Sequence, residues 1–257
     1  MFDHISPASF RLTNARIVTG DRVLQGSVSV EQGLIAELRE GPADGIDCAG
    51  AYLTPGVVDI HTDHVETHVF PRASVMWDFL NALMAHDMVV IGAGTTTVFD
   101  SLSVGASMKR PERREILGPL VEALEQGVAR GLFRAEHFLH MRCEISDPDT
   151  MALVDANIGR PITRLASVMD HTPGDRQSMD VDHWTERMAR EMKLGTEEMA
   201  ERREELFARS ARVGAQVRAH VVAAAGARRL PLMTHDDRTL AHVEQSHAEG
   251  IAVSEFP

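Results

Sequence analysis

Histidines and carboxylates follow a series of apolar segments in this sequence, at the point where each segment ends. The first segment, "GVVDI", is followed by His61 and Asp63. Alternate residues of a strand share a face, so we expect these two side chains to aim at one point. Imidazole nitrogen and carboxylate oxygen bind borderline-soft divalent ions at about 2.0–2.2 Å. The spacing therefore indicates a metal site.

The same kind of ending recurs along the chain. Glu144 follows "HMRC", His171 follows "SVMD" and His235 follows "PLMT". A single histidine after a strand is more often an ordinary hydrogen-bonded loop residue, so the prediction depends on their joint occurrence. Two ions ~3.5–4 Å apart need a bridging carboxylate, and Glu144 is the candidate for that role. His137 and His140 lie inside a strand and are interpreted as core or supporting groups.

Alternating strands and helices must position these side chains. Apolar runs typical of buried parallel strands occur at 56–63, 94–101, 133–147, 162–175, 230–237 and 251–257. Helical patterns separate them at 75–91, 111–130, 149–158, 181–226 and 237–249, the fourth being divided near "KLGTEE". Six such units predict a parallel α/β architecture, either an open doubly wound sheet or an incomplete barrel. Met76, Met84 and Met88 are expected to pack in the core.

The first part of the chain has a different texture. Residues 10–53 alternate apolar and polar side chains and break at "TGD" and "EQG", which predicts a small antiparallel sheet. We therefore expect a small β-sheet domain over 1–54 and strand–helix units over 55–257, about six of the eight that a barrel needs. The final "SEFP" is typical of a strand end, so the sequence is expected to be a piece of a longer chain.

Composition narrows the classes of function. The chain has 257 residues, with 26 Lys and Arg against 38 Asp and Glu and a formal charge of -12. This acidic balance disfavours binding to nucleic acid or to a membrane surface. No apolar run approaches the ~20 residues of a membrane span, and "MFDHISPASF" lacks the features of a signal peptide. Cys48 and Cys143 lie far apart. We expect a globular, cytoplasmic protein, for which a homo-oligomer stays open.

The segment "LTPGVVDIHTDHVETHVFPR" resembles the opening strand of the amidohydrolase superfamily. Most members carry His-x-His here, whereas this chain has His61-Thr62-Asp63. That departure, with "GTTTVFDS", "HMRCEISD", "VMDHTPGDRQ" and "THDD", resembles the PhnM-type branch, the α-D-ribose 1-methylphosphonate 5-triphosphate diphosphatases of the carbon–phosphorus lyase pathway. The similarity covers essentially all of 10–257. It implies a TIM-like (β/α)8 barrel, incomplete at the C-terminus, with a small N-terminal β-sheet domain belonging to a composite β-sandwich.

The resemblance also implies roles for single residues. The implied metal ligands are His61, Asp63, Glu144, His171 and His235. They imply one or two divalent ions, zinc first, with manganese, iron and nickel also open. The superfamily's general-base Asp ends the eighth strand and is expected beyond residue 257, so no catalytic residue is assigned. The implied reaction is hydrolysis of the 5-triphosphate of the ribose phosphonate to a 5-phosphate and pyrophosphate.

A triphosphate needs local positive charge in this acidic chain. Arg72, Arg176 and Arg238 are the candidates for phosphate binding, since the fork of arginine suits bidentate contact. Lys109 and Arg142 also lie near strand ends but are interpreted more simply as surface salt bridges. Two alternatives stay open. One is another amidohydrolase reaction on a cyclic amide or amidine; the other is a truncated, non-catalytic chain of a phosphonate-degrading assembly.

Overall fold

The computed structural model describes residues 9–72, 75–105, 108 and 111–256. The chain divides into two compact units, Met1–Val57 and Val58–Pro257. The sequence placed its boundary three residues earlier, between 54 and 55. Among the described residues, no helix is long and apolar enough to cross a membrane.

The first unit is a mixed sheet rather than the antiparallel sheet that the alternation predicted. Its strands are β1 (Phe10–Val18), β2 (Val23–Glu31), β3 (Leu34–Glu40), β4 (Ile46–Asp47) and β5 (Tyr52–Leu53). β1, β2 and β3 pair antiparallel, but β4 and β5 both pair with β1 in parallel. The two-residue turn Gln32-Gly33 between β2 and β3 has positive φ at both positions, as the twist of a tight hairpin requires.

The second unit carries a six-stranded sheet, which confirms the α/β prediction. Its strands are β6 (Val57–Thr62), β7 (Thr95–Val104), β8 (Glu136–Glu144), β9 (Thr163–Met169), β10 (Leu232–His235) and β11 (Val253–Glu255). They are ordered β11-β10-β9-β8-β7-β6, and β7 to β11 pair in parallel. Chain order therefore equals sheet order, as in a half-barrel.

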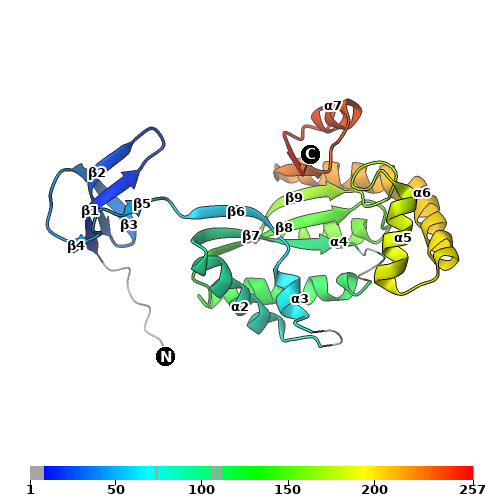
Figure 1. Ribbon diagram of the computed structural model, residues 1–257, viewed down its shortest axis with the longest axis horizontal. Helices are drawn as coiled ribbons and strands as arrows, with labels where there is room; N and C mark the ends of the chain where they lie inside the picture. The colour runs from blue at the N-terminus through cyan, green and yellow to red at the C-terminus, as the bar shows by residue number, and fades with distance from the viewer. Residues whose placement is uncertain (1–8, 73–74, 106–107, 109–110, 257) are drawn as a thin grey trace. The chain divides into compact units, whose positions relative to one another are not determined.

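Helices connect successive strands of this sheet. They are α1 (Val65–Val69), α2 (Phe79–Gly92), α3 (Arg113–Ala129), α4 (Thr150–Asn157), α5 (Val181–Met192), α6 (Thr196–Arg228) and α7 (Leu240–Ala248). Figure 1 shows α2 and α3 along one side of the strands, and α5 near the ends of β8 and β9. Lys193 adopts a left-handed conformation that ends α5, and α6 begins after Gly195, so the division falls inside "KLGTEE".

The core lies between the outer face of the sheet and the helices. Along β8, Leu139, Met141 and Cys143 are buried against the helices, while His140, Arg142 and Glu144 point to the inner face. Period-two alternation in one strand thus assigns one set of side chains to packing and the other to chemistry.

Three methionines contradict the packing that their spacing predicted. Met76, Met84 and Met88 are exposed. Met76 lies before α2 begins, so it is not on the helix at all, whereas Met84 and Met88 are exposed because α2 turns a different stripe inward, one that includes His86 and Asp87. Polar side chains on the buried stripe conceal its direction in the sequence.

Candidate metal centre

Three side chains from separate strands meet at the carboxyl end of the parallel sheet. His61 on β6, His235 on β10 and Glu255 on β11 each offer a ligand atom, and these atoms lie within 4.8 Å of one another. His171, just after β9, has its ring centroid 5.9 Å from that of His235, and the rings of His61 and His235 are equally far apart. The three imidazoles that the sequence singled out are therefore neighbours in space.

Each of these imidazoles has a carboxylate at its Nδ1. The contacts are His61 Nδ1 to Glu255 Oε1 at 2.7 Å, His171 Nδ1 to Glu144 Oε2 at 2.6 Å and His235 Nδ1 to Asp236 Oδ2 at 2.6 Å. Metal-binding histidines in proteins usually donate one ring N–H to a carboxylate, which orients the ring and leaves the other nitrogen for the metal. This arrangement suits Nε2 ligation by His171 and His235.

Asp236 reaches His235 from a strained backbone. Its φ is 59°, a left-handed conformation that costs free energy for a residue with a Cβ. In this conformation its carboxylate lies beside the imidazole of the preceding residue, 2.6 Å from Nδ1. The contact agrees with a role for Asp236 in positioning the ring of His235.

Within the cluster formed by His61, His235 and Glu255, the pKa values of the two imidazoles are shifted in opposite directions. Burial opposes charge on His61, but hydrogen bonds to Asp63 and Glu255 outweigh it and raise the pKa of His61 to about 9. For His235, burial prevails over the hydrogen bond to Asp236 and lowers its pKa, which favours the neutral form. Neutral imidazole is the form that binds metal, so a cation at this cluster would replace a proton on His61 and no proton on His235.

The surroundings of one carboxylate oxygen of Glu255 indicate whether the cluster suits a cation. Glu255 Oε2 is buried, and no described residue donates a hydrogen bond to it. A buried carboxylate oxygen without a partner is costly unless a positive charge approaches it. Two imidazoles and this carboxylate form a donor set that divalent zinc, manganese, iron or nickel accept. The residues therefore fit a divalent cation.

The other two sequence-predicted ligands lie beside the cluster. Asp63 is exposed at the rim, with Oδ1 3.3 Å from His61 Nε2 and 2.5 Å from Arg142 Nη1. Burial of its carboxylate is outweighed by the hydrogen bond to His61 and the charge of Arg142, and the pKa of Asp63 falls to about 2. Glu144 is buried and accepts hydrogen bonds from Ser146 as well as contacting His171. Its bridging role stays a prediction.

Glu255 is the group that sequence reasoning missed as a ligand. It was recognisable only as a carboxylate at the end of the last apolar run, "IAV", in the position that His235 takes one strand earlier. Nothing in spacing alone separated it from the other acidic residues that follow strands. Parallel pairing of His235 with Glu255 in adjacent strands supplies the missing information.

The two histidines inside β8 take opposite faces. His140 is buried beneath His61, with ring centroids 5.3 Å apart, and contacts Ser101, Ser167 and the carbonyl of Ile60. Burial, reinforced by the nearby charge of His61, lowers the pKa of His140 to about 3. His137 points to the outer face and contacts acidic residues of α2 and β7.

A cavity of about 240 Å³ adjoins the cluster. Asp63, Glu144 and His171 contribute to its wall. Its arginines are Arg113, Arg142, Arg187 and Arg209. Arg142 is buried, so the interpretation of this residue as a surface salt bridge is wrong: β8 directs it to the inner face of the sheet, where it pairs with the exposed Asp63 at the rim of the cavity.

The three arginines predicted to bind phosphate do not line this cavity. Arg72 is exposed and lies in a short bridge with Val75. Arg176 is buried and bonds to Asp237 and Gln245, while Arg238 is exposed and donates to the carbonyl of Arg176. Lys109 lies outside the described residues.

Comparison with known proteins shows what the chain is similar to. No family model matches the chain. It is 34% identical over 249 residues to the alpha-D-ribose 1-methylphosphonate 5-triphosphate diphosphatase of Escherichia coli (strain K12), covering 96% of this chain and 66% of that protein. It is also 37% identical over 92 residues to a D-hydantoinase of Ralstonia pickettii, covering 35% of this chain and 19% of that one. The chain thus spans about two thirds of the first relative and a fifth of the second.

Solved structures resemble the chain more distantly. N-isopropylammelide isopropylaminohydrolase from Burkholderia multivorans has a TM-score of 0.49 at 18% identity, covering 96% of this chain and 67% of that one. N-acetyl-D-glucosamine-6-phosphate deacetylase from Mycobacterium smegmatis has a TM-score of 0.48 at 15% identity, covering 95% and 59%. On the sequence relationship to the Escherichia coli protein, the chain belongs to the amidohydrolase superfamily, as a PhnM-like member. Members of this superfamily are typically metal-dependent hydrolases, and the histidine–carboxylate cluster agrees with that class.

Proposed function

We propose that this chain carries the metal centre of a diphosphatase that hydrolyses the 5-triphosphate of α-D-ribose 1-methylphosphonate 5-triphosphate to the 5-phosphate and pyrophosphate, in phosphonate catabolism. The observation that carries the proposal is the meeting of His61, His235 and Glu255 beside a cavity lined by arginines. The name of the Escherichia coli relative supplies the substrate. The acidic balance of the chain favours a small-molecule substrate over nucleic acid or a membrane.

The chain's own residues would hold the cation and set its surroundings. The proposed ligands are those named from the sequence, with Glu255 added: His61, Asp63, Glu144, His171, His235 and Glu255. Asp236 fixes the ring of His235, and the buried hydrogen bonds of His140 support the strand beneath His61. A divalent cation, zinc being our first choice, would supply a Lewis acid that lowers the pKa of water from 15.7 toward ~7.

Positive side chains would orient the phosphates. Arg142 bonds to Asp63, which contacts His61 of the cluster, and it presents a buried Nε without a partner among the described residues. Arg72, Arg176 and Arg238 stay our sequence-based candidates for contacts to phosphate groups that extend outside the cavity. Fixed guanidinium groups stabilise the charge that develops on phosphoryl oxygens.

A second candidate reaction is hydrolysis of a cyclic amide. The observation that favours it is the 37% identity to D-hydantoinases over 92 residues. The same metal centre would serve both reactions, because the fold does not determine the substrate. The arginines of the cavity favour the phosphate reading, since a neutral ring amide does not require several cations around it.

The test is a substrate panel with the purified chain in each of zinc, manganese, iron and nickel. Release of pyrophosphate from the ribose phosphonate triphosphate, followed by ³¹P NMR, would support the proposal. Turnover of hydantoin or dihydrouracil with intact triphosphate would replace it with the amide reaction. Metal binding with no turnover of any substrate would indicate a non-catalytic chain. His171→Ala and His235→Ala should lower metal content and abolish whichever turnover is found.

A further inference from the structure

The α5–α6 segment turns two arginines toward the cavity beside the metal cluster. On α5, Arg187 lies three residues after Trp184 and directly before Met188. On α6, Arg209 follows Leu206 by about one helical turn. All five residues line the 240 Å³ cavity together with Glu144 and His171. The segment thus reaches the same space as the candidate metal centre.

A small apolar cluster holds the two helices in place. Trp184, Met188, Met199 and Leu206 are buried against one another between α5 and α6, separately from the main core. Arg187 lies three residues after Trp184 and Arg209 three residues after Leu206, so each arginine is beside a packed anchor on its helix and the packing of the cluster orients these helix faces. The two side chains are pre-positioned and pay less conformational entropy on binding a ligand.

Among the described residues, the guanidinium groups of Arg187 and Arg209 have no carboxylate paired with them. Arg113 pairs with Glu66 and Arg142 pairs with Asp63, whereas neither Arg187 nor Arg209 forms an ion pair with a carboxylate in the part of the chain that the structure describes. The Nε atoms of Arg187 and Arg209 are buried and lack a hydrogen-bond acceptor there. A buried guanidinium donor without an acceptor is unfavourable until an anion supplies one.

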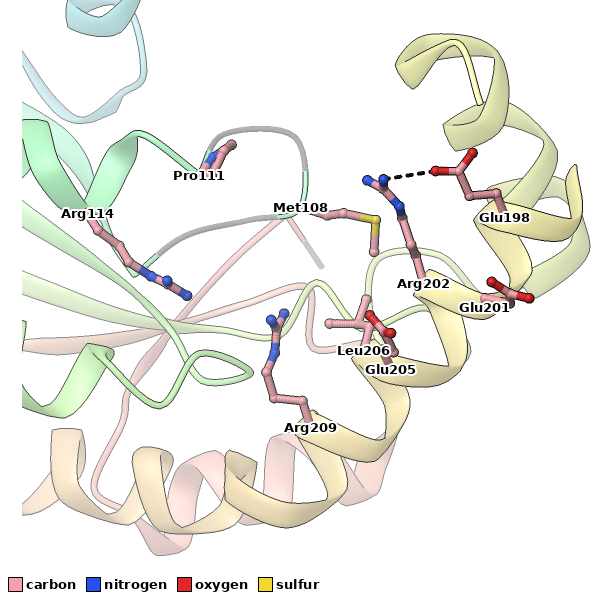
Figure 2. Close-up of a pocket in the computed structure, with 9 residues that line it drawn as sticks. All are labelled: Met108, Pro111, Arg114, Glu198, Glu201, Arg202, Glu205, Leu206 and Arg209. Carbon is pink, nitrogen blue, oxygen red and sulfur yellow. Dashed lines mark hydrogen bonds and ion pairs between the residues drawn. The ribbon is translucent and has the colours of Figure 1, made fainter. Parts of the chain in front are cut away.

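A neighbouring pocket differs from the cavity in how its arginines are paired. This outer pocket, of about 590 Å³, shares Arg209 and Leu206 with the cavity and opens along α6 (Figure 2). Figure 2 shows Arg202 directed at Glu198, with which it pairs at 3.0 Å, and Arg114 extending toward Arg209. Arg114 is itself paired with Asp147, and the acidic residues of this pocket are Glu198, Glu201 and Glu205. Of the three arginines of this outer pocket, Arg114 and Arg202 are thus held in ion pairs, and the shared Arg209 is the one that forms none with the described residues.

We propose that Arg187 and Arg209 form an oligophosphate clamp. In this clamp the two guanidinium groups bind phosphoryl oxygens of the substrate's phosphate chain, and the phosphate group to be cleaved lies toward the candidate metal centre. The identity of the substrate rests on the proposed function, but the anion site rests on the cavity alone. The α5–α6 segment, which connects β9 to β10, then makes the site selective for polyanionic substrates.

The experiment measures binding of inorganic tripolyphosphate to the full chain by calorimetry, after treatment with a chelator and its removal. Arg187→Met and Arg209→Met should each raise Kd at least about tenfold, since a charge-assisted hydrogen bond is lost. Arg187→Lys and Arg209→Lys keep the charge and should fall between wild type and the Met variants. The matched controls are Arg190→Met on α5 and Arg212→Met on α6, both exposed, which should bind as wild type does.

Two results would overturn the clamp: wild type that does not bind tripolyphosphate, or Met and Lys variants that bind it as tightly as wild type. The Lys variants keep the test valid if a Met variant fails to fold. Failure of the proposed function has a different signature, because tripolyphosphate would still bind through both arginines while no phosphoanhydride is cleaved. If the triphosphate is hydrolysed, the same variants should raise KM more than they lower kcat.

Discussion

The Nδ1 atom of His61 lies 2.7 Å from Oε1 of Glu255, which joins the two edge strands of the parallel sheet. β6 and β11 stand at opposite ends of the strand order, and the residues are 194 positions apart in sequence. A flat six-stranded sheet would hold its edges ~24 Å apart, given the ~4.8 Å spacing of strands. The contact therefore requires a strongly curved sheet, and this curvature brings the strand-end side chains to one point.

Replacement Glu255→Gln tests the ligand set. The change removes a negative charge but keeps the shape, and zinc affinity should fall at least about tenfold by titration calorimetry. It also removes the carboxylate charge of Glu255, which helps to raise the pKa of His61, so NMR titration of the metal-free protein should show that pKa falling from about 9. Exposed Glu244→Gln on α7 is the matched control and should change neither quantity. Unaltered zinc affinity in Glu255→Gln would remove this residue from the ligand set.

Replacement Glu144→Gln decides between two roles for that carboxylate. If Glu144 bridges two ions, the variant should hold fewer ions per chain by elemental analysis, because the bridge is lost. If it orients His171, the number of ions should stay the same and the affinity should fall by about ten- to a hundredfold. A variant that equals wild type in both number and affinity would contradict both roles.

The buried pair of His137 and Asp100 predicts a pH-dependent stability. Their closest atoms, Nδ1 and Oδ2, are 2.8 Å apart. Burial opposes both charges, but the mutual hydrogen bond prevails: it lowers the pKa of Asp100 and raises the pKa of His137. The contribution of His137 is fully present below its ordinary value of 6.5 and is lost as the pH rises through its raised pKa. That of Asp100 is present above 3.8 and is lost as the pH falls through its lowered pKa.

Urea unfolding of wild type and His137→Gln at several pH values measures this effect. The difference in free energy of unfolding should be largest between about pH 4 and pH 6.5 and should shrink at higher pH. Exposed His247→Gln is the control, for which we expect no such trend. A difference that does not vary from pH 5 to pH 9 would contradict this prediction.

Two glycine-to-alanine changes should act in opposite directions. Gly105 ends β7 with φ +100°, and a Cβ there would lie 2.3 Å from Oγ1 of Thr150, so Gly105→Ala should destabilise the protein by about 1–3 kcal/mol or more. Gly226 lies inside α6, near its end, with nothing within 4 Å of its Cβ position, so Gly226→Ala should stabilise the protein by about 0.5–1 kcal/mol through helix propensity. Thermal unfolding monitored by circular dichroism compares them. Equal effects of the two changes would refute this explanation.

Much of the second unit was predictable because its signals are local. Apolar runs, turn residues and helical periodicity located all six strands of the parallel sheet and the division of α5 from α6. The failures concern relationships that local patterns do not encode. Met84 and Met88 have helical spacing, but the buried face of α2 is selected by His86 and Asp87, which interact with β7 and β8 rather than with solvent.

The candidate site shows the same division. Histidines and carboxylates after apolar runs identified His61 and His235, since residue type and position relative to a strand are both written in the chain. The sequence did not indicate that Arg187 and Arg209 face the cavity. They lie in a charged helical stretch, where solvated and cavity-facing arginines cannot be told apart by sequence.

By itself, the sequence determined the kinds of elements, their order and the chemistry available at the strand ends, because these depend on side-chain type and short-range spacing. Only the tertiary structure decided which of those groups meet. The curvature of the sheet selected Glu255 as the partner of His61, and the packing of α5 on α6 selected which arginines face the cavity. Both selections depend on the summed packing of residues far apart in the chain, which no local pattern records.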